Sequence, residues 1–165
     1  MSLYKVNDLA TQSLSRNALP VQTVIFWVAT GNPDRVAVPL NTPGGKIAIF
    51  ELSKPGRQPD GVIPALVHGT KVMDFMWDPF DNQRLAVGTD DGRIWLWRIP
   101  SDGLKEQTNK PEWSTAGHAE KVYFVRFHPL AQDVLATGSY DLSIRVWDLA
   151  MQQDMIIIHL PQEQV

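Results

Sequence analysis

The 165-residue chain contains no cysteine, which excludes disulfides and thiolate metal sites built from its own residues. Neither sign of charge predominates, because 15 basic and 18 acidic side chains leave a net charge of −3. A nucleic-acid surface or a membrane-docking face usually shows a basic cluster, which this balance does not favour. We therefore expect no nucleic-acid partner.

Long hydrophobic runs are missing as well. The longest are residues 24–29 and 155–158, far short of the roughly 20 residues that a membrane-spanning helix needs. The first residues, from Met1 to Lys5, lack the apolar core of a secretory signal. From these absences we expect a cytoplasmic protein without membrane insertion.

What the sequence has instead is a repeat with a period of 50 residues. Residues 66–99 align with residues 116–149 without a gap, and 10 of the 34 positions are identical. The identical pairs include His68/His118, Gly88/Gly138, Asp91/Asp141 and Trp97/Trp147. Repeats of this kind predict a stacked architecture in which each unit packs against its neighbours.

Each unit consists of short apolar runs separated by turn residues. In the second unit the runs are residues 122–127, 134–139 and 143–148. The first unit turns at residues 90–92, where an Asp-Gly pair suits a hairpin. This spacing predicts antiparallel strands, and residues 155–160 are the clearest candidate for a fourth, outer strand.

Weaker copies flank the two clear ones. Residues 35–52 resemble the first unit, with Phe50 in the place of the tryptophan, and a further copy begins at 161–165. We therefore predict an all-β chain of about three four-stranded antiparallel blades, preceded by a separate segment at 1–19. The blades are expected at about 20–64, 65–115 and 116–160.

The second unit resembles the WD-repeat signature, in Gly117-His118, Ser139-Tyr140-Asp141 and Trp147-Asp148. The resemblance covers residues 20–165 and implies a fragment of a WD-repeat β-propeller. In that family a His, a Ser or Thr, an Asp and a Trp form a hydrogen-bonded chain inside each blade. The sets implied here are His118, Ser139, Asp141 and Trp147 in one blade, and His68, Thr89, Asp91 and Trp97 in the other.

A narrower resemblance is to the coronins, most of all to the second propeller of those with two propellers in tandem. Residues 29–38 and 43–47 look like the first coronin blade, and residues 97–104 look like the connection after the next one. The resemblance implies binding to actin filaments or to regulators of the actin cytoskeleton or membrane traffic. Residues 4–8 match the basic coronin start poorly, and the coronin coiled coil is absent.

Ser139, His118 and Asp141 also contain the side chains of a serine-hydrolase triad. The neighbouring unit repeats the pattern with Thr89 in the place of the serine, and an active site is not normally duplicated in each blade. We therefore favour a structural network and expect no catalytic residues and no enzymatic activity.

Metal and phosphate sites are not favoured either. The four histidines are scattered singly, and no ligand spacing of a known metal site appears, so we expect no metal and no other cofactor. The run Gly44-Gly45-Lys46 precedes a strand, whereas a phosphate-binding loop must open a helix. A hairpin turn is the better interpretation of that run.

Partners of propellers commonly bind the loops that lead into each blade and the turn between its second and third strands. Tyr140, in that turn, is the best candidate contact, because tyrosine suits interface anchors. Lys71, Lys121 and Asp90 lie at related positions and are further candidates. The alternative is that these lysines are simply solvated.

We accordingly expect a non-catalytic protein-interaction scaffold of the coronin type, linked to the actin cytoskeleton or to vesicle traffic. One alternative is a generic WD-repeat adaptor, for example one that recruits substrates to a ubiquitin ligase. Another is a self-assembling unit, because about three blades leave open sheet faces that copies of the chain could cover.

Overall fold

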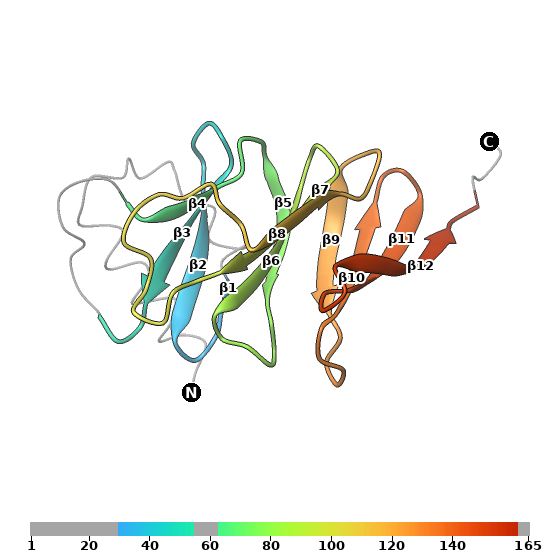
Figure 1. Ribbon diagram of the computed structural model, residues 1–165. Coiled ribbons are helices and arrows are strands. Elements are labelled where there is room, and N and C mark those ends of the chain that lie inside the picture. Colours follow the sequence, from blue (N-terminus) through green and yellow to red (C-terminus); the bar gives the residue numbers. More distant parts are fainter. Residues whose placement is uncertain (1–29, 55–62, 162–165) are drawn as a thin grey trace.

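The computed structural model describes residues 30–54 and 63–161 as a row of three antiparallel sheets (Figure 1). These ranges contain no helix, and therefore none that could cross a membrane. The expected segment at 1–19, residues 20–29 of the first blade and residues 162–165 of the further copy lie outside the described residues.

Each sheet has four strands, and each strand pairs with the next one along the chain. The first sheet contains β1 (Thr30–Gly31), β2 (Arg35–Leu40), β3 (Lys46–Glu51) and β4 (Ala65–Val67). The second contains β5 (Val72–Trp77), β6 (Arg84–Thr89), β7 (Arg93–Arg98) and β8 (Trp113–Ala116). The third contains β9 (Val122–Phe127), β10 (Val134–Ser139), β11 (Ser143–Asp148) and β12 (Gln153–His159).

The expected fold class is confirmed, because the described chain consists of three four-stranded antiparallel sheets. The outer strand β8 ends one residue beyond the boundary expected at residue 115, whereas β4 begins at Ala65 and lies wholly beyond the boundary expected at residue 64. The strand expected at residues 155–160 overlaps β12, which pairs with β11.

The second sheet is apolar on both faces because it lies between the other two. Successive side chains of a strand point to opposite faces, yet Ile94, Leu96 and Trp97 of β7 are all at most 1% exposed. One face packs against Ala37, Ile47 and Leu66 of the first sheet. The other packs against Val122, Val125 and Trp147 of the third. Burial of both faces makes this sheet the centre of the described fold.

A glycine fixes the close approach of the second and third sheets. A β-carbon added at Gly88 of β6 would lie 2.5 Å from a methyl carbon of Val122 and 2.9 Å from one of Val125. No side chain fits there unless β9 moves away. The aligned Gly138 is covered by a residue of its own sheet, Phe124, whose ring a β-carbon would meet at 2.1 Å.

Two arginines join neighbouring sheets. Arg35 of β2 pairs with Glu51 and donates to the carbonyls of Asn82, at 3.1 Å, and Pro100, at 3.0 Å, both beside the second sheet. Arg84 of β6 also reaches the next blade, but through ion pairs: it pairs with Asp78 of its own blade and with Asp133 of the third. The 50-residue repeat places Val134 at this position in the third sheet.

Candidate functional site

The loops that carry the candidate contacts gather at one end of the sheets, the upper end in Figure 1. The β6–β7 and β10–β11 turns lie there, together with the segments that lead into β5 and β9. Gly92 of the first turn has φ +77° and packs against the chain leading into β9, because the His118 amide donates to the Gly92 carbonyl at 3.1 Å. The β6–β7 turn is thus held by the neighbouring blade.

The third blade contains a directional chain of hydrogen bonds. The indole N–H of Trp147 donates to Thr137 Oγ1 at 2.8 Å, and that hydroxyl lies 2.8 Å from His118 Nε2. His118 Nδ1 lies 3.0 Å from a carboxylate oxygen of Asp141. A neutral His118 that carries its proton on Nδ1 satisfies every contact, since it accepts from the threonine and donates to the aspartate.

The hydroxyl in this chain belongs to Thr137 and not to Ser139. Ser139 Oγ donates to the Glu120 carbonyl at 2.9 Å and accepts from the Asp141 amide at 3.1 Å, so it fastens the turn. Thr137 was not predicted from the sequence, because the repeat aligns it with the apolar Val87. Three of the four residues that the family resemblance implies, His118, Asp141 and Trp147, form this chain, and Thr137 stands in the place expected for Ser139.

In the second blade the buried tryptophan and histidine contact each other without an intervening hydroxyl. Trp97 Nε1 donates directly to His68 Nε2 at 3.0 Å, and His68 Nδ1 lies 2.7 Å from the Gly45 carbonyl of the first blade. Thr89 and Asp91 form a separate pair, with 2.6 Å between their oxygens, and Thr89 also accepts from the indole of Trp95 at 3.2 Å. The structure thus divides the four expected residues into two pairs.

Burial sets the charge of these groups. Burial lowers the pKa of His68 to about 4, although the Gly45 carbonyl and the Asp91 charge oppose the shift. Burial also lowers the pKa of His118, although the hydrogen bond that its ring donates to Asp141 opposes the shift. Burial opposes ionisation of Asp141, but hydrogen bonds from Ser143 and the Ala119 amide hold its pKa well below the usual range. Both histidines are therefore neutral at pH 7.

The geometry of a serine triad is not formed by these residues. Ser139 makes its two hydrogen bonds to backbone atoms, while the ring nitrogens of His118 contact Thr137, Asp141 and Ser143. A general base must lie within hydrogen-bond reach of the hydroxyl that it activates. Among the described residues, no group of three or more acidic or histidine side chains is arranged to hold a metal ion.

Tyr140 lies where the sequence predicts an exposed contact. Its side chain is 63% exposed, and its ring packs edge to face on that of Tyr123, with 5.4 Å between centroids. Tyr123 is itself 41% exposed and touches Phe124 in the same manner, at 5.2 Å. Aromatic rings held against one another offer a preorganised contact surface at this end of the third blade.

Tyr123 was not identified from the sequence because a β-bulge reorients it. Ser139 lies opposite Val122 and Gly138 lies opposite Phe124, so Tyr123 is the extra residue of β9. The bulge recurs in the second sheet, where Met73 is skipped between Val72 and Asp74. A bulge turns a side chain away from strict alternation, and the sequence run alone does not indicate where that occurs.

The other candidate contacts lie in the corresponding loops of the second and third blades. Lys71 and Lys121 are exposed. Asp90 is half-buried, and its carboxylate accepts hydrogen bonds from the Thr70 hydroxyl and from the Lys71 amide, the latter at 3.1 Å. Asp90 therefore fastens the loop that leads into β5, whereas the two lysines are exposed to solvent.

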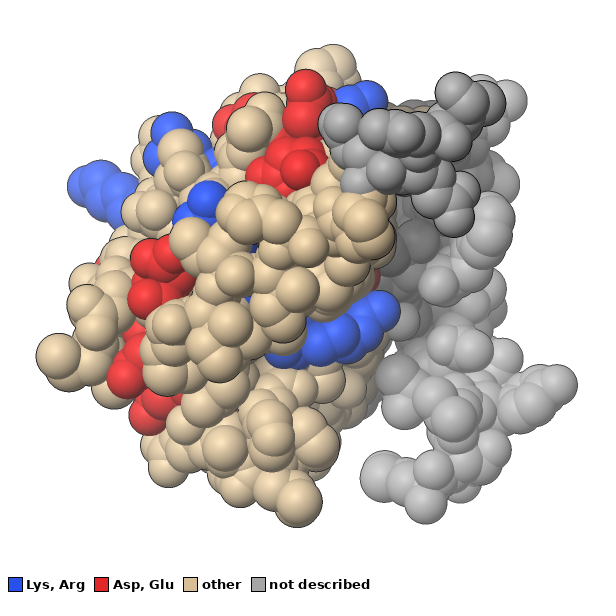
Figure 2. Space-filling model, turned by 90° about the vertical axis from the view of Figure 1, so that its right-hand side faces the viewer, with Lys and Arg blue, Asp and Glu red and all other residues tan. Residues whose placement is uncertain are grey.

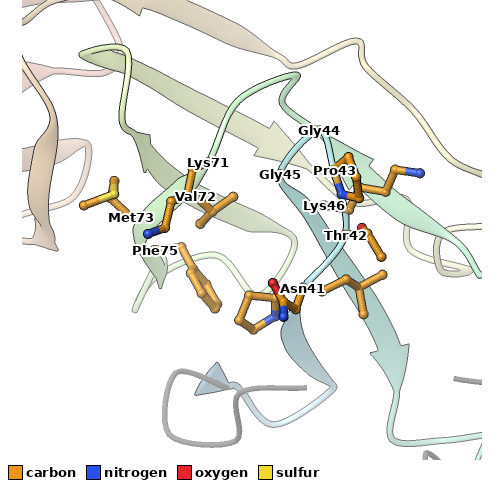
Figure 3. A pocket seen from close by; sticks show the side chains of 12 residues that line it. Asn41, Thr42, Pro43, Gly44, Gly45, Lys46, Lys71, Val72, Met73 and Phe75 are labelled. Carbon is orange, nitrogen blue, oxygen red and sulfur yellow. The ribbon is translucent and has the colours of Figure 1, made fainter. Parts of the chain in front are cut away.

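A cavity of about 460 Å³ opens beside Lys71, between the first two blades. Figure 3 shows Lys71, Val72, Met73 and Phe75 on one side, facing the β2–β3 turn on the other. That turn contains the Gly44-Gly45-Lys46 run, which joins two antiparallel strands. A β-carbon at Gly45 would lie 1.6 Å from the Thr70 carbonyl oxygen, so only glycine fits there.

Comparison with known proteins identifies repeats and relatives. The model of the WD domain, G-beta repeat, matches residues 65–98 and 109–148. Coronin-7 of Rattus norvegicus is 53% identical over 131 residues, and that of Homo sapiens is 51% identical over 134. These alignments cover 79% and 81% of the chain and 14% of each relative, so the chain spans a small part of their length. A coronin-like protein of Saccharomyces cerevisiae is 35% identical over 127 residues, 72% of the chain and 20% of the relative.

The solved structures show the same fold. The WD40 domain of Toxoplasma gondii coronin superposes with a TM-score of 0.73 at 21% identity, covering 80% of the chain and 34% of that domain. A chain of a mitotic checkpoint complex superposes with a TM-score of 0.61 at 20% identity, covering 79% of this chain and 38% of its own length. At these identities the likeness concerns the arrangement of strands alone.

Proposed function

Because the chain belongs to the coronin family of WD-repeat proteins, we propose that it is a non-catalytic, cytoplasmic interaction scaffold of the coronin type. The partners proposed are actin filaments, or regulators of the actin cytoskeleton or of vesicle traffic. The partner would bind the end of the blades that carries Tyr140. Fold alone does not separate these partners, so the proposal depends on the residues exposed there.

The exposed aromatic pair is the observation that carries the proposal. Tyr140 and Tyr123 leave 63% and 41% of their surface in solvent while already packed against each other. Tyrosine is enriched among the residues that dominate binding energy, and a ring that is already held loses little conformational freedom on binding. Lys121 lies two residues before Tyr123, and Lys71 lies at the equivalent place of the preceding blade.

A co-sedimentation experiment with actin filaments tests the proposal. Tyr140→Ala is expected to weaken binding by tenfold or more, since truncation of a central anchor costs about 2 kcal/mol. The matched control is Phe80→Ala, because Phe80 is also an exposed aromatic, 48% exposed, but lies in the β5–β6 loop at the opposite end. Equal binding by both variants would place the contact elsewhere.

Absence of the wild-type chain from the filament pellet would remove actin as the partner of these blades. The generic adaptor would then be the better hypothesis, and its partner would still need the tyrosines. Charge reversal of Lys71 and Lys121 to glutamate should slow association and reduce its salt dependence if the partner is acidic.

A second candidate function, assembly of several copies into a ring, is favoured by the open face of the third sheet. Ile156 and Ile158 of β12 are 52% and 47% exposed on that face. In Figure 2, which shows this side, uncharged residues cover most of the described surface and charged side chains form separate clusters. Val146→Lys on β11 should prevent assembly through this face, as measured by the mass in solution.

A further inference from the structure

The outer edges of the three sheets are protected to different degrees. The edge of β4 is covered, because the Val67 amide donates to the Thr108 carbonyl at 2.8 Å and the Thr108 amide donates to the Ala65 carbonyl at 2.9 Å. The edge strand of the second sheet, β8, is only four residues long, and two of them, Ser114 and Thr115, are polar. The edge of the third sheet, β12, is seven residues long, and no described strand pairs with its outer side.

The residues of β12 lack the features that protect edge strands. Met155, Ile156, Ile157 and Ile158 form one apolar run whose members are between 42% and 52% exposed. The strand contains no lysine and no proline, and its one carboxylate, Asp154, is paired with Arg145 at 3.3 Å. Exposed, long and apolar edges otherwise recruit another strand. This edge is therefore suited to receive one.

The hydrogen-bond pattern shows which backbone groups are available. The Leu160 amide donates to the Leu142 carbonyl at 2.7 Å, so Leu160 directs its backbone groups towards the third sheet. Residues alternate along an antiparallel ladder between inward and outward backbone groups. Ile157 and His159, which lie opposite Arg145 and Ser143, therefore direct their N–H and C=O groups to the open edge.

We propose that β12 pairs with the β12 strand of a second copy of the chain, in antiparallel orientation. The two-fold axis passes beside Ile157, which lies opposite Ile157 of the other copy. Such pairing uses one edge twice and satisfies the outward groups of Ile157 and His159 on both copies. The two third sheets then form one continuous sheet.

The apolar run of β12 is self-complementary in this register. Ile156 lies opposite Ile158, and Met155 lies opposite His159, so no charged side chain faces another of the same sign. The two Asp154 carboxylates are about 20 Å apart, six residues along an extended strand. Cross-strand pairs of branched apolar side chains stabilise a sheet. A second copy therefore fits this edge on both backbone and side-chain grounds.

Pairing through the edge is distinct from packing on the open face. Ile157 lies opposite Arg145, whose guanidinium is 6.0 Å from the ring centre of the buried Trp147, so both belong to the face turned towards the second sheet. Ile156 and Ile158 belong to the other face, because successive side chains alternate. A contact on the face and a contact at the edge thus involve different side chains.

Disulfide crosslinking of single-cysteine variants distinguishes the two contacts. The chain has no cysteine of its own, so every crosslink must come from the introduced residue. Ile157→Cys is expected to form a disulfide-linked dimer on mild oxidation, because this position meets itself at the axis. Ile158→Cys is the matched control and should crosslink far less, since its neighbour is Ile156. Crosslinking of Ile158→Cys without that of Ile157→Cys would place the contact on the sheet face and overturn the edge pairing.

The mass in solution gives a second test. Sedimentation should show a concentration-dependent dimer of the wild-type chain, and Ile157→Lys should weaken it by tenfold or more while the circular dichroism is kept. Met151→Lys is the control, because Met151 is 66% exposed but lies in the β11–β12 turn. A wild-type chain that stays monomeric up to about 1 mM, the limit of weak association, would overturn the proposal.

Ile157→Pro tests the backbone pairing directly. The Ile157 amide points away from β11, so proline there removes an outward donor and leaves the bonds to β11 intact. The dimer should be lost and the third sheet should remain. If this variant does not fold, the comparison of Ile157→Lys with Met151→Lys decides the matter alone.

Discussion

At the residue scale, the second and third blades differ in how a buried histidine meets a buried tryptophan. Thr137 inserts a hydroxyl between His118 and Trp147, whereas Trp97 reaches His68 directly because Val87 occupies the aligned position. Each arrangement leaves both ring systems satisfied in the interior. The repeat thus preserves the histidine and the tryptophan and changes what lies between them.

Thr137→Val should therefore destabilise the chain, although it copies the residue of the neighbouring blade. The substitution leaves the Trp147 indole and His118 Nε2 without their shared partner, which costs about 2 kcal/mol in unfolding free energy. Thr137→Ser keeps the hydroxyl and should lose much less. Urea denaturation of both variants measures the difference, and equal stabilities would show that the hydroxyl does not link these rings.

The lowered pKa of His68 predicts loss of stability in mild acid. The folded-state pKa, about 4, lies below the ordinary value of 6.5, so the unfolded chain takes up the proton first as pH falls. The contribution of neutral His68 is complete above pH 6.5 and is lost progressively between pH 6.5 and 4. This amounts to a few kcal/mol.

Urea denaturation between pH 7.5 and 4.5 measures this slope. His68→Gln should reduce it, since glutamine does not titrate. An unchanged slope in His68→Gln would assign the acid sensitivity to other groups, of which His118 is the next candidate.

At the element scale, the sheets are joined by polar side chains that reach across as well as by apolar packing. Arg84 connects β6 to Asp133 before β10, and Asp74 of β5 accepts from the Val125 amide of β9 at 2.8 Å. The repeat replaces Arg84 by Val134 and Asp74 by Phe124 in the third sheet. Its open face thus lacks the polar contacts that join the second sheet to the third.

Arg84→Met should weaken the contact between the second and third blades. Asp78, whose side chain is 1% exposed, would lose its cation, and an unpaired buried charge costs about 3 kcal/mol or more. Arg98→Met is the matched control, since Arg98 is 44% exposed and pairs with Asp81 and Glu112 at the surface. That change should cost less than about 1 kcal/mol. Equal losses in thermal unfolding would contradict the role of Arg84.

At the scale of the whole molecule, stability should depend on the position of a sheet in the row. Each sheet contacts only its neighbours, so the second sheet alone among the described sheets is covered by described residues on both faces. Leu85, Val87 and Ile94 of this sheet are fully buried, whereas every residue of β12 is exposed. The chain should therefore open from the third sheet inwards.

Hydrogen exchange measures this order. At low concentration, where self-association is absent, the amides of β6 and β7 should exchange slowest and those of β12 fastest. Raising the concentration should protect the β12 amides alone if the edges pair. Uniform protection of all three sheets would instead indicate one cooperative unit.

The sequence alone was sufficient for the fold class and for the family. Strand and turn positions repeat every 50 residues, and the family resemblance pointed to His118, Asp141 and Trp147 of the third-blade chain but not to Thr137. Thr137 escaped because its aligned partner is Val87, and a repeat reveals shared residues but not a substitution that performs a role in one copy. The exposure of Tyr140 was predictable because a tyrosine at the tip of a tight turn has no core to pack into, and its role as a partner contact stays a prediction.

Other features were decided by the tertiary structure. The β9 bulge exposes Tyr123, although its strand reads as a continuous apolar run, because one extra residue changes which side chain faces solvent. The open edge of β12 and the covered edge of β4 differ through Thr108, which lies in a connection distant along the chain. Sequence periodicity determines which strands form, whereas only packing between distant segments determines which of their edges and side chains stay exposed.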